Sequence, residues 1–229
     1  SWSFLTGKSS SYQAGGGIGI QLYNSFFLLV ITLFISVPLS MGAGIYLAEY
    51  AKKGRVTNFV RTCIEILSSL PSVVIFVVQF EYGFSIISGA LALTVFNLPQ
   101  MTRNVEDSLK HVHHTQREAG LALGLSRWET VLHVVIPEAL PGIVTGVVLA
   151  SGQSAPALDW SNWNVLSVTS PISIFRQAET LAVHIWKVNS EGTIPDGTLV
   201  SAGSAAVLLI FILIFNFGAR KLGSYLHKK

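Results

Sequence analysis

Long uncharged runs alternate with short charged segments along the chain. Four stretches contain no Asp, Glu, Lys or Arg, and they are Ser9–Ala48, Tyr82–Thr102, Ala139–Leu158 and Gly197–Ala219. A helix needs about 20 apolar residues to cross the roughly 30 Å hydrocarbon core of a bilayer. We therefore predict an all-α integral membrane protein with about five membrane-spanning helices, at residues 20–48, 62–80, 84–102, 138–158 and 199–219.

Composition supports this class of protein. Of the 229 residues, 50% are hydrophobic and 12% are charged, and the mean hydropathy is +0.55. Soluble proteins carry about 25% charged residues. A water-soluble chain is therefore excluded, and the single cysteine, Cys63, excludes an internal disulfide bond.

Positive charges gather in three short regions. These are Lys52–Arg61, Arg103–Arg127 and Arg220–Lys229, and they hold 12 of the 15 Lys and Arg residues. Loops that stay in the cytoplasm retain Lys and Arg. We therefore expect a cytoplasmic loop at residues 103–137 and an external loop at residues 159–197, within a single membrane domain over residues 1–229. The same topology explains the pI near 9.1 without nucleic-acid binding.

The loop at residues 103–137 has helical signals of its own. Thr115–Glu118 and Ser126–Glu129 have the spacing of capping boxes, in which a hydroxyl and a carboxylate bond to free amides at a helix start. Gly124 suits the left-handed conformation that ends a helix. We predict two short helices that meet at a bend and expose Leu121, Leu125 and Trp128. Such a surface either docks into a partner or packs against its own membrane domain, and the pattern leaves both open.

A longer pattern in this loop resembles the EAA motif of ABC importer permeases. That motif is Glu-Ala-Ala, three residues, Gly, nine residues, an aliphatic residue, one residue, an aliphatic residue and Pro. It is matched here by Glu118, Ala119, Gly120, Gly124, Val134, Ile136 and Pro137, with Gly120 in place of the second Ala. The segments ISVPLSMGAGIYLAEYA, FSIISGALALTVFNLP and SPISIFRQA also resemble the permease subunits of phosphate-importing ABC transporters.

The resemblance implies the fold of a type I ABC importer permease, whose family has six membrane helices, the first of them absent here. It implies no enzymatic activity and no cofactor in this chain, because ATP and Mg²⁺ bind to a partner ATPase. The implied partners are a second homologous permease, two copies of the cytoplasmic ATPase, an external phosphate-binding protein and the lipids of a bacterial cytoplasmic membrane. The implied ATPase-coupling residues are Glu118, Ala119, Gly120, Gly124, Leu125, Ser126, Arg127 and Trp128.

Three further positions are candidate sites. Gly142 and Gly146 form a small-xxx-small pair, which lets two helices approach closely. Arg103, at the inner end of a predicted span, is a candidate contact for an anionic substrate. The three histidines between residues 111 and 114 do not share one helical face, so we predict no metal site.

The chain is shorter than the family at two places. Near Ala150–Gly152 the family continues with a Gly-Arg-Ala-x-Gly-Glu type of segment, and nothing like it is present. Counted from Pro137, with Pro141 marking the entry to the membrane, only about 14 residues look membrane-like, fewer than the roughly 17 that a span needs. The run near Val74–Phe76 is short as well, and we expect family residues to be missing from both places.

Other functions stay open at this point. A permease for sulfate or molybdate would share the EAA motif. An ion-coupled secondary transporter would carry ionisable residues inside its spans, and the clearest spans here have none. A non-transporting membrane scaffold is the third alternative, and co-purification with an ATPase would separate it from an importer.

Overall fold

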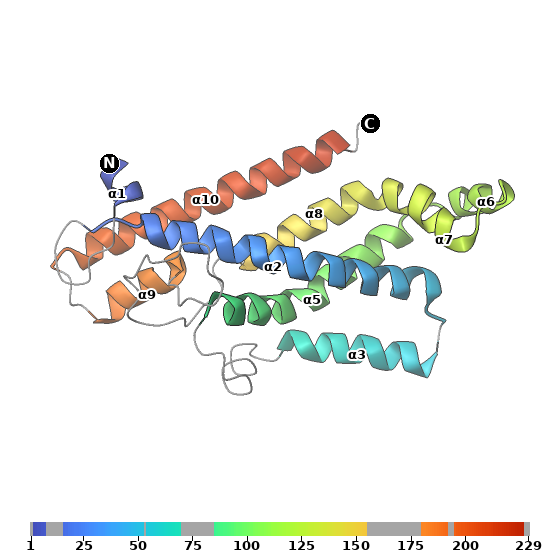
Figure 1. Cartoon of the computed structure of the whole chain (residues 1–229), viewed down its shortest axis with the longest axis horizontal. Coiled ribbons are helices and arrows are strands. Elements are labelled where there is room, and N and C mark those ends of the chain that lie inside the picture. The colour runs from blue at the N-terminus through green and yellow to red at the C-terminus, as the bar shows by residue number, and fades with distance from the viewer. Residues whose placement is uncertain are drawn as a thin grey trace. The chain divides into compact units, whose positions relative to one another are not determined.

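The computed structural model describes residues 2–7, 16–52, 54–69, 85–154, 180–191 and 195–226, and all regular structure within these ranges is helical (Figure 1). In chain order, the elements are α1 (Trp2–Thr6), α2 (Gly19–Ile45), η1 (Tyr46–Tyr50), α3 (Arg55–Ser69), α5 (Ile86–Lys110), α6 (His114–Ala122), α7 (Arg127–Thr130), η2 (Val131–Val135), α8 (Ile136–Ser154), α9 (Leu181–Glu191) and α10 (Gly197–Leu226). The two η elements are single π-helical turns. This agrees with the predicted all-α class.

Three helical stretches among the described residues are long and apolar enough to cross a membrane. They are Gly19–Tyr50, Arg127–Leu149 and Gly197–Gly218, with mean hydropathies of 2.2, 1.8 and 2.5. The first and third coincide with the predicted spans 20–48 and 199–219, whereas the second overlaps the predicted span 138–158 only over residues 138–149. The predicted span 84–102 is helical as part of α5, but it is not one of these three. Most of the predicted span 62–80 lies outside the described residues, and its first part belongs to α3.

Helix α5 does not end where the predicted loop begins. It continues from Ile86 to Lys110 with no break at Arg103, and Pro99 lies inside it. The connection between α5 and α6 is therefore only the short segment 111–113. The expected 35-residue loop at 103–137 is instead the end of one long helix, a bent helix pair and the start of the next long helix.

The next long helix also begins earlier than its prolines suggest. α7, η2 and α8 follow one another without interruption from Arg127 to Ser154, with Pro137 and Pro141 inside this run. The π-helical turn η2 ends two residues before Pro137, and such an irregular turn accommodates the hydrogen bond that a proline cannot donate. Counting the span from Pro137 was therefore wrong, and the uninterrupted helix has the length to cross a bilayer.

The chain divides into two compact units. The first contains α1, α2 up to Phe34, α5 up to Thr94, α9, and α10 up to Ile214. Its buried core consists of Leu28, Ile86, Ala90 and Leu93. The second contains the rest of α2, η1, α3, the rest of α5, α6, α7, η2, α8 up to Gly152, and the end of α10 from Phe215. It holds the predicted coupling residues, so the second unit is the one that positions the candidate site.

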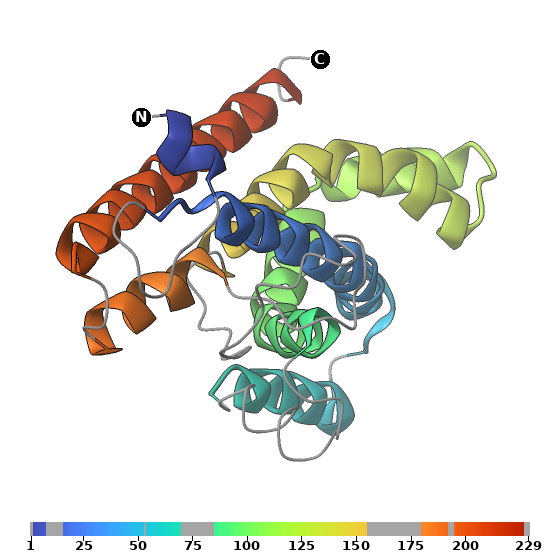
Figure 2. The ribbon, with the colours of Figure 1, turned by 60° about the vertical axis from the view of Figure 1, so that its left-hand side comes forward.

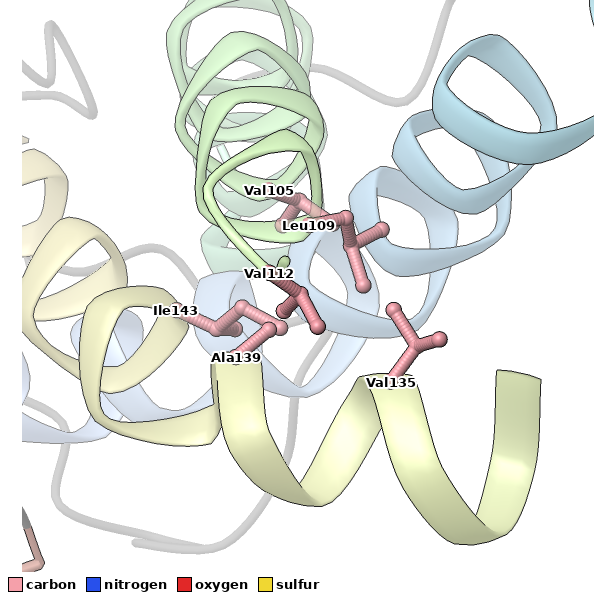
Figure 3. Close-up of a cluster of buried hydrophobic side chains, with 6 residues drawn as sticks. All are labelled: Val105, Leu109, Val112, Val135, Ala139 and Ile143. Atoms are coloured by element: carbon pink, nitrogen blue, oxygen red, sulfur yellow. The ribbon is translucent and has the colours of Figure 1, made fainter. Parts of the chain in front are cut away.

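The core of the second unit lies where α5 ends and α8 begins. Val105, Leu109 and Val112 point toward side chains from η2 and α8, and the six buried residues in this cluster are Val105, Leu109, Val112, Val135, Ala139 and Ile143 (Figure 3). Full burial of an aliphatic side chain stabilises a fold by about 1.5–3 kcal/mol. The end of α5 and the η2–α8 junction are therefore packed together firmly, directly beside the bent helix pair.

Candidate functional site

The bend between α6 and α7 is closed by main-chain hydrogen bonds around Gly124. Gly124 has a φ of +84°, the left-handed conformation that the sequence predicted. The amide of Leu125 donates to the carbonyl of Gly120 at 3.3 Å, and the amide of Gly124 donates to that of Leu121 at 3.0 Å. These two bonds form a Schellman motif, which satisfies carbonyls at the end of α6. The pair of helices forms the turn between α5 and α8 (Figures 1 and 2).

The start of α7 has the predicted capping box. The main-chain amide of Ser126 donates to Oε2 of Glu129 at 2.8 Å, and the amide of Glu129 donates to Oγ of Ser126 at 3.3 Å. This reciprocal pair satisfies amides that have no partner inside the helix. Ser126 and Glu129 thereby fix the direction in which α7 leaves the bend.

The capping box predicted at Thr115–Glu118 was wrong. Helix α6 begins at His114, its N-cap residue is His113, and no side chain caps it. Thr115 is therefore already inside the helix, two residues after the cap position. Glu118 instead lies 3.1 Å from Nδ1 of His114, one helical turn earlier, and both side chains are exposed.

Gly120 allows α6 to contact α7 closely. A Cβ atom at Gly120 would lie 2.8 Å from Cγ2 of Thr130 and 3.1 Å from its Oγ1, closer than side chains can pack. Both residues are buried. This contact gives a physical reason for Gly at the position where the EAA motif has its second Ala: here the two short helices touch through it.

Three large apolar side chains lie exposed around the bend. Leu121, Leu123 and Trp128 are 46%, 82% and 51% exposed, and we call these three residues the apolar tip. Leu125, which the sequence also placed on this surface, is half-buried. The other predicted coupling residues, Glu118, Ala119, Ser126 and Arg127, are exposed around the tip, whereas Gly120 is buried beneath it.

Arg117 joins α6 to the ends of two long helices. Its Nε and Nη2 donate to Oε1 of Glu49 in η1, at 3.1 and 2.8 Å. Its Nη1 donates to the carbonyl of Val112 at 2.6 Å, and Nη2 also donates to the carbonyl of Leu109 at 2.7 Å. The side chains of Arg117 and Glu49 are only 19% and 13% exposed. We call this set the Arg117 junction, and it fixes α6 to the end of α2–η1 and to the end of α5.

The sequence reasoning missed the Arg117 junction. Arg117 counted only as one positive charge among four, and Glu49 received no role. A signal was present, because Glu49 is the first charged residue after the uncharged run Ser9–Ala48. A carboxylate directly at the end of an apolar helix has to find a partner when it is buried.

The predicted helix-packing pair lies against α5. A Cβ atom on Gly142 would lie 2.8 Å from Oγ of Ser108, and one on Gly146 would lie 2.7 Å from Cβ of Asn104. Nδ2 of the Asn104 side chain also donates to the main-chain carbonyl of Gly146 at 3.3 Å. At both glycines, α8 approaches α5 more closely than any larger residue would permit.

Arg103 lies on α5 at a cavity of about 410 Å³ that Arg61, Glu106 and Lys110 also line. Glu106 is buried and accepts hydrogen bonds from both Arg61 and Lys110. Burial by itself would raise the pKa of Glu106, but the Lys110 and Arg61 cations hold that pKa below its usual value. A role for Arg103 in a substrate pathway stays a prediction.

Comparison with known proteins places this geometry in a family. The family described as "Binding-protein-dependent transport system inner membrane component" matches residues 40–229. The probable ABC transporter permease protein YqgI of Bacillus subtilis is 51% identical, with 100% of this chain and 85% of that protein aligned. The phosphate transport system permease protein PstA of Xylella fastidiosa is 31% identical over 90% of this chain and 75% of that protein. PstA 2 of Mycobacterium bovis is 31% identical over 96% of this chain and 75% of that protein.

The alignment with YqgI also bears on the two short places in the chain. It extends over 250 residues, whereas this chain has 229, so at least 21 residues of that relative have no counterpart here. This agrees with the expectation that family residues are missing inside the chain. Ala150–Gly152 lie within the uninterrupted helix α8, and Val74–Phe76 lie outside the described residues.

Solved structures show the same fold. An inward-facing structure of the MetNI methionine ABC transporter superimposes with a TM-score of 0.68 at 18% identity, over 92% of this chain and 94% of that one. The family match contradicts the alternative of an ion-coupled secondary transporter. The protein is an all-helical, non-catalytic, multi-pass permease subunit of an ABC importer in a bacterial inner membrane, and it belongs to the family of binding-protein-dependent transport system inner membrane components.

Proposed function

We propose that the chain lines the pathway of a phosphate importer, and that the α6–α7 pair passes the movement of a partner ATPase to the membrane helices. ATP and Mg²⁺ bind to that ATPase and not to this chain. The further partners are a second homologous permease and an external phosphate-binding protein.

The similarity to PstA proteins supports phosphate as the substrate. Those relatives are named phosphate transport system permeases, and they align with nine-tenths or more of this chain at 31% identity. The name of the more similar relative, YqgI, states no substrate. Sulfate and molybdate are therefore the alternatives that an experiment has to separate from phosphate.

The apolar tip carries the proposal for ATPase docking. Leu123 and Trp128 are large side chains exposed to solvent on a helix pair that caps and main-chain bonds hold in one shape. Clusters of exposed apolar side chains mark interaction surfaces, and aromatic anchors dominate the energy of such interfaces. A partner that covers Leu121, Leu123 and Trp128 removes this apolar surface from water.

The Arg117 junction explains how docking can act on the membrane. The Gly120–Thr130 contact makes α6 and α7 move as one body. Arg117 then connects that body to Glu49 at the end of α2–η1 and to the carbonyls of Leu109 and Val112 at the end of α5. A displacement of the apolar tip is therefore delivered to the ends of α2, α5 and α8 together.

The substrate is tested by ATP hydrolysis in the reconstituted complex. Proteoliposomes that contain the permeases, the ATPase and the external binding protein are supplied with phosphate, sulfate or molybdate in turn. We expect phosphate to stimulate hydrolysis and the other two ions to leave it at the basal rate. Stimulation by sulfate or molybdate alone would contradict the phosphate assignment while leaving the coupling role intact.

Docking is tested by placing one negative charge at two positions of the same helix pair. Leu123→Glu puts the charge at the apolar tip, at a side chain so exposed that folding is not disturbed. The matched control, Thr115→Glu, puts it on the exposed start of α6, where a carboxylate suits the helix dipole. We expect L123E to lose ATP-driven uptake and T115E to keep it, with equal amounts of both in the membrane. Unchanged uptake in L123E would contradict docking at the tip.

A further inference from the structure

The cavity beside Arg103 lies away from the apolar tip and has no role in the proposed coupling. Its volume is about 410 Å³, and η1, α3 and α5 each contribute to its walls. All of its lining residues belong to the second unit. The charges of the cavity and its position along the helices indicate which kind of ligand it suits.

Among the described residues, the charged side chains that line the cavity carry one surplus positive charge. Arg61, Arg103 and Lys110 line it, together with the carboxylates of Glu106 and Asp107. Glu106 is buried and bonded to Arg61 and Lys110, so it organises two of the cations, while Asp107 and Arg103 are exposed. Three cations against two carboxylates suit a ligand with a single negative charge.

One residue of the same wall has a buried hydroxyl. Thr102 lines the cavity, its side chain is 1% exposed, and its Oγ1 has no hydrogen-bond partner within the described part of the chain. Buried hydroxyls normally find a partner. The Oγ1 atom is itself shielded, so the charged side chains of the wall, and not this hydroxyl, are the groups that meet a ligand.

The remaining walls and the position of the cavity suit an amphiphile. Leu47, Ile64 and Pro99 give it an apolar side. The uncharged runs Ser9–Ala48 and Tyr82–Thr102 both end at this level, where the apolar part of α2 and α5 gives way to charged residues. Lipid headgroups lie at that boundary, and basic pockets between helices on the cytoplasmic side bind anionic headgroups.

We propose that this cavity binds the phosphodiester headgroup of an anionic membrane lipid. A phosphodiester carries one negative charge, which matches the surplus in the walls, and its glycerol and acyl chains can lie against Leu47 and Ile64. Inorganic phosphate carries more than one charge at neutral pH and has no apolar part, so it matches less well. The cytoplasmic placement rests on the orientation in the proposed function, but lipid binding itself can be measured without any transport.

The test is the amount of phosphatidylglycerol that the full chain retains when detergent extracts it from bacterial membranes, measured by mass spectrometry. Arg103→Gln removes a cation from the cavity, and Thr102→Val changes a wall residue whose hydroxyl is shielded, at nearly constant shape. Lys52→Gln is the matched control, because Lys52 is an exposed cation that does not line the cavity. Thermal unfolding midpoints are measured to check that all three variants are folded.

We expect R103Q to retain roughly fivefold less phosphatidylglycerol than the unaltered chain, and K52Q to stay within about twofold of it. T102V should retain about as much as the unaltered chain, because the hydroxyl it removes is shielded, and inorganic phosphate added in excess should not displace the lipid. Equal retention in R103Q and the unaltered chain would overturn the site. Equal losses in R103Q and K52Q would show a diffuse surface attraction instead, and displacement by inorganic phosphate would assign the cavity to the free ion. None of these results depends on whether the importer carries phosphate.

Discussion

Two largely buried carboxylates in the second unit are each bonded to an arginine, yet their surroundings differ. Glu49 accepts from Arg117, whose other donors are bonded to main-chain carbonyls at the end of α5, and both side chains are largely buried. Glu106 accepts from Arg61 and Lys110, whose side chains are 42% and 48% exposed. Cations at helix carbonyl ends gain from the helix dipole as well as from the ion pair. The Glu49–Arg117 pair is therefore shielded and held in one geometry, whereas the ion pairs of Glu106 line a cavity that is open to solvent.

The largest effect is expected from a substitution that breaks the Arg117 junction. Arg117→Lys keeps the positive charge but loses the planar fork that reaches Glu49 and two carbonyls at once. We expect a loss of roughly 2 kcal/mol in the free energy of unfolding, since hydrogen bonds to charged groups contribute about 1.5–3 kcal/mol each. Uptake by the reconstituted complex should fall at least tenfold while basal ATP hydrolysis continues, because the tip still docks.

The matched change on the other pair is Arg61→Lys. Lys can still reach Glu106 from a half-exposed position, where ion pairs contribute about 0–1 kcal/mol. Thermal unfolding and uptake should therefore stay close to those of the unaltered chain. An equal loss of uptake in R61K and R117K would contradict the contrast between the two pairs.

The next effect tests whether α6 and α7 move as one body. Gly120→Ala places a methyl group 2.8 Å from Cγ2 of Thr130, and overpacking of this kind costs about 1–3 kcal/mol. Chemical denaturation should show that loss, and uptake should fall with it. Adding Thr130→Ser removes Cγ2, so the double variant should recover part of both; no recovery would place the strain elsewhere.

A smaller effect concerns the pH dependence of the stability that Glu106 contributes through its ion pairs with Arg61 and Lys110. The pKa of Glu106 is lowered in the folded protein, because Lys110 and Arg61 outweigh the effect of burial. Its contribution to stability is therefore fully present above the unfolded value of about 4.3 and is lost as pH falls through the lowered folded pKa. Unfolding midpoints across this acid range should fall more steeply for the unaltered chain than for Glu106→Gln, and parallel curves would contradict the assignment.

The smallest effect is at the cap of α7. Ser126→Ala removes the hydroxyl that accepts from the Glu129 amide, and such caps contribute about 0.5–2 kcal/mol. Ser126→Asp retains an acceptor and should leave the unfolding free energy nearly unchanged. Because the cap lies in the bend and not at the junction, S126A should lower stability without uncoupling ATP hydrolysis from uptake.

Local signals in the sequence were enough to predict the bend between α6 and α7. Gly124 and the Ser126–Glu129 box depend on residues within one turn of each other, so their spacing predicts them directly. The start of the membrane span was predicted wrongly because it, too, was taken from local residues. Pro137 suggests a helix start, but the η2 turn before it keeps the helix continuous.

Contacts between distant residues could not be predicted in this way. Arg117 and Glu49 are 68 residues apart, and Arg61 and Glu106 are 45 apart. Nothing in either segment alone states which of several cations meets which carboxylate. The small-residue pair Gly142 and Gly146 predicts close packing, but only the structure shows that Ser108 and Asn104 of α5 lie opposite.

The central claim is that a partner ATPase covers the apolar tip and acts through the Arg117 junction. Hydrogen exchange of the permease, measured with and without the ATPase, tests it most directly. The account predicts slower exchange in residues 114–130 and at the end of α5 around Leu109–Val112 when the ATPase is added, with no change in α10. Exchange that is unaltered in 114–130, or slowed only in α10, would contradict it.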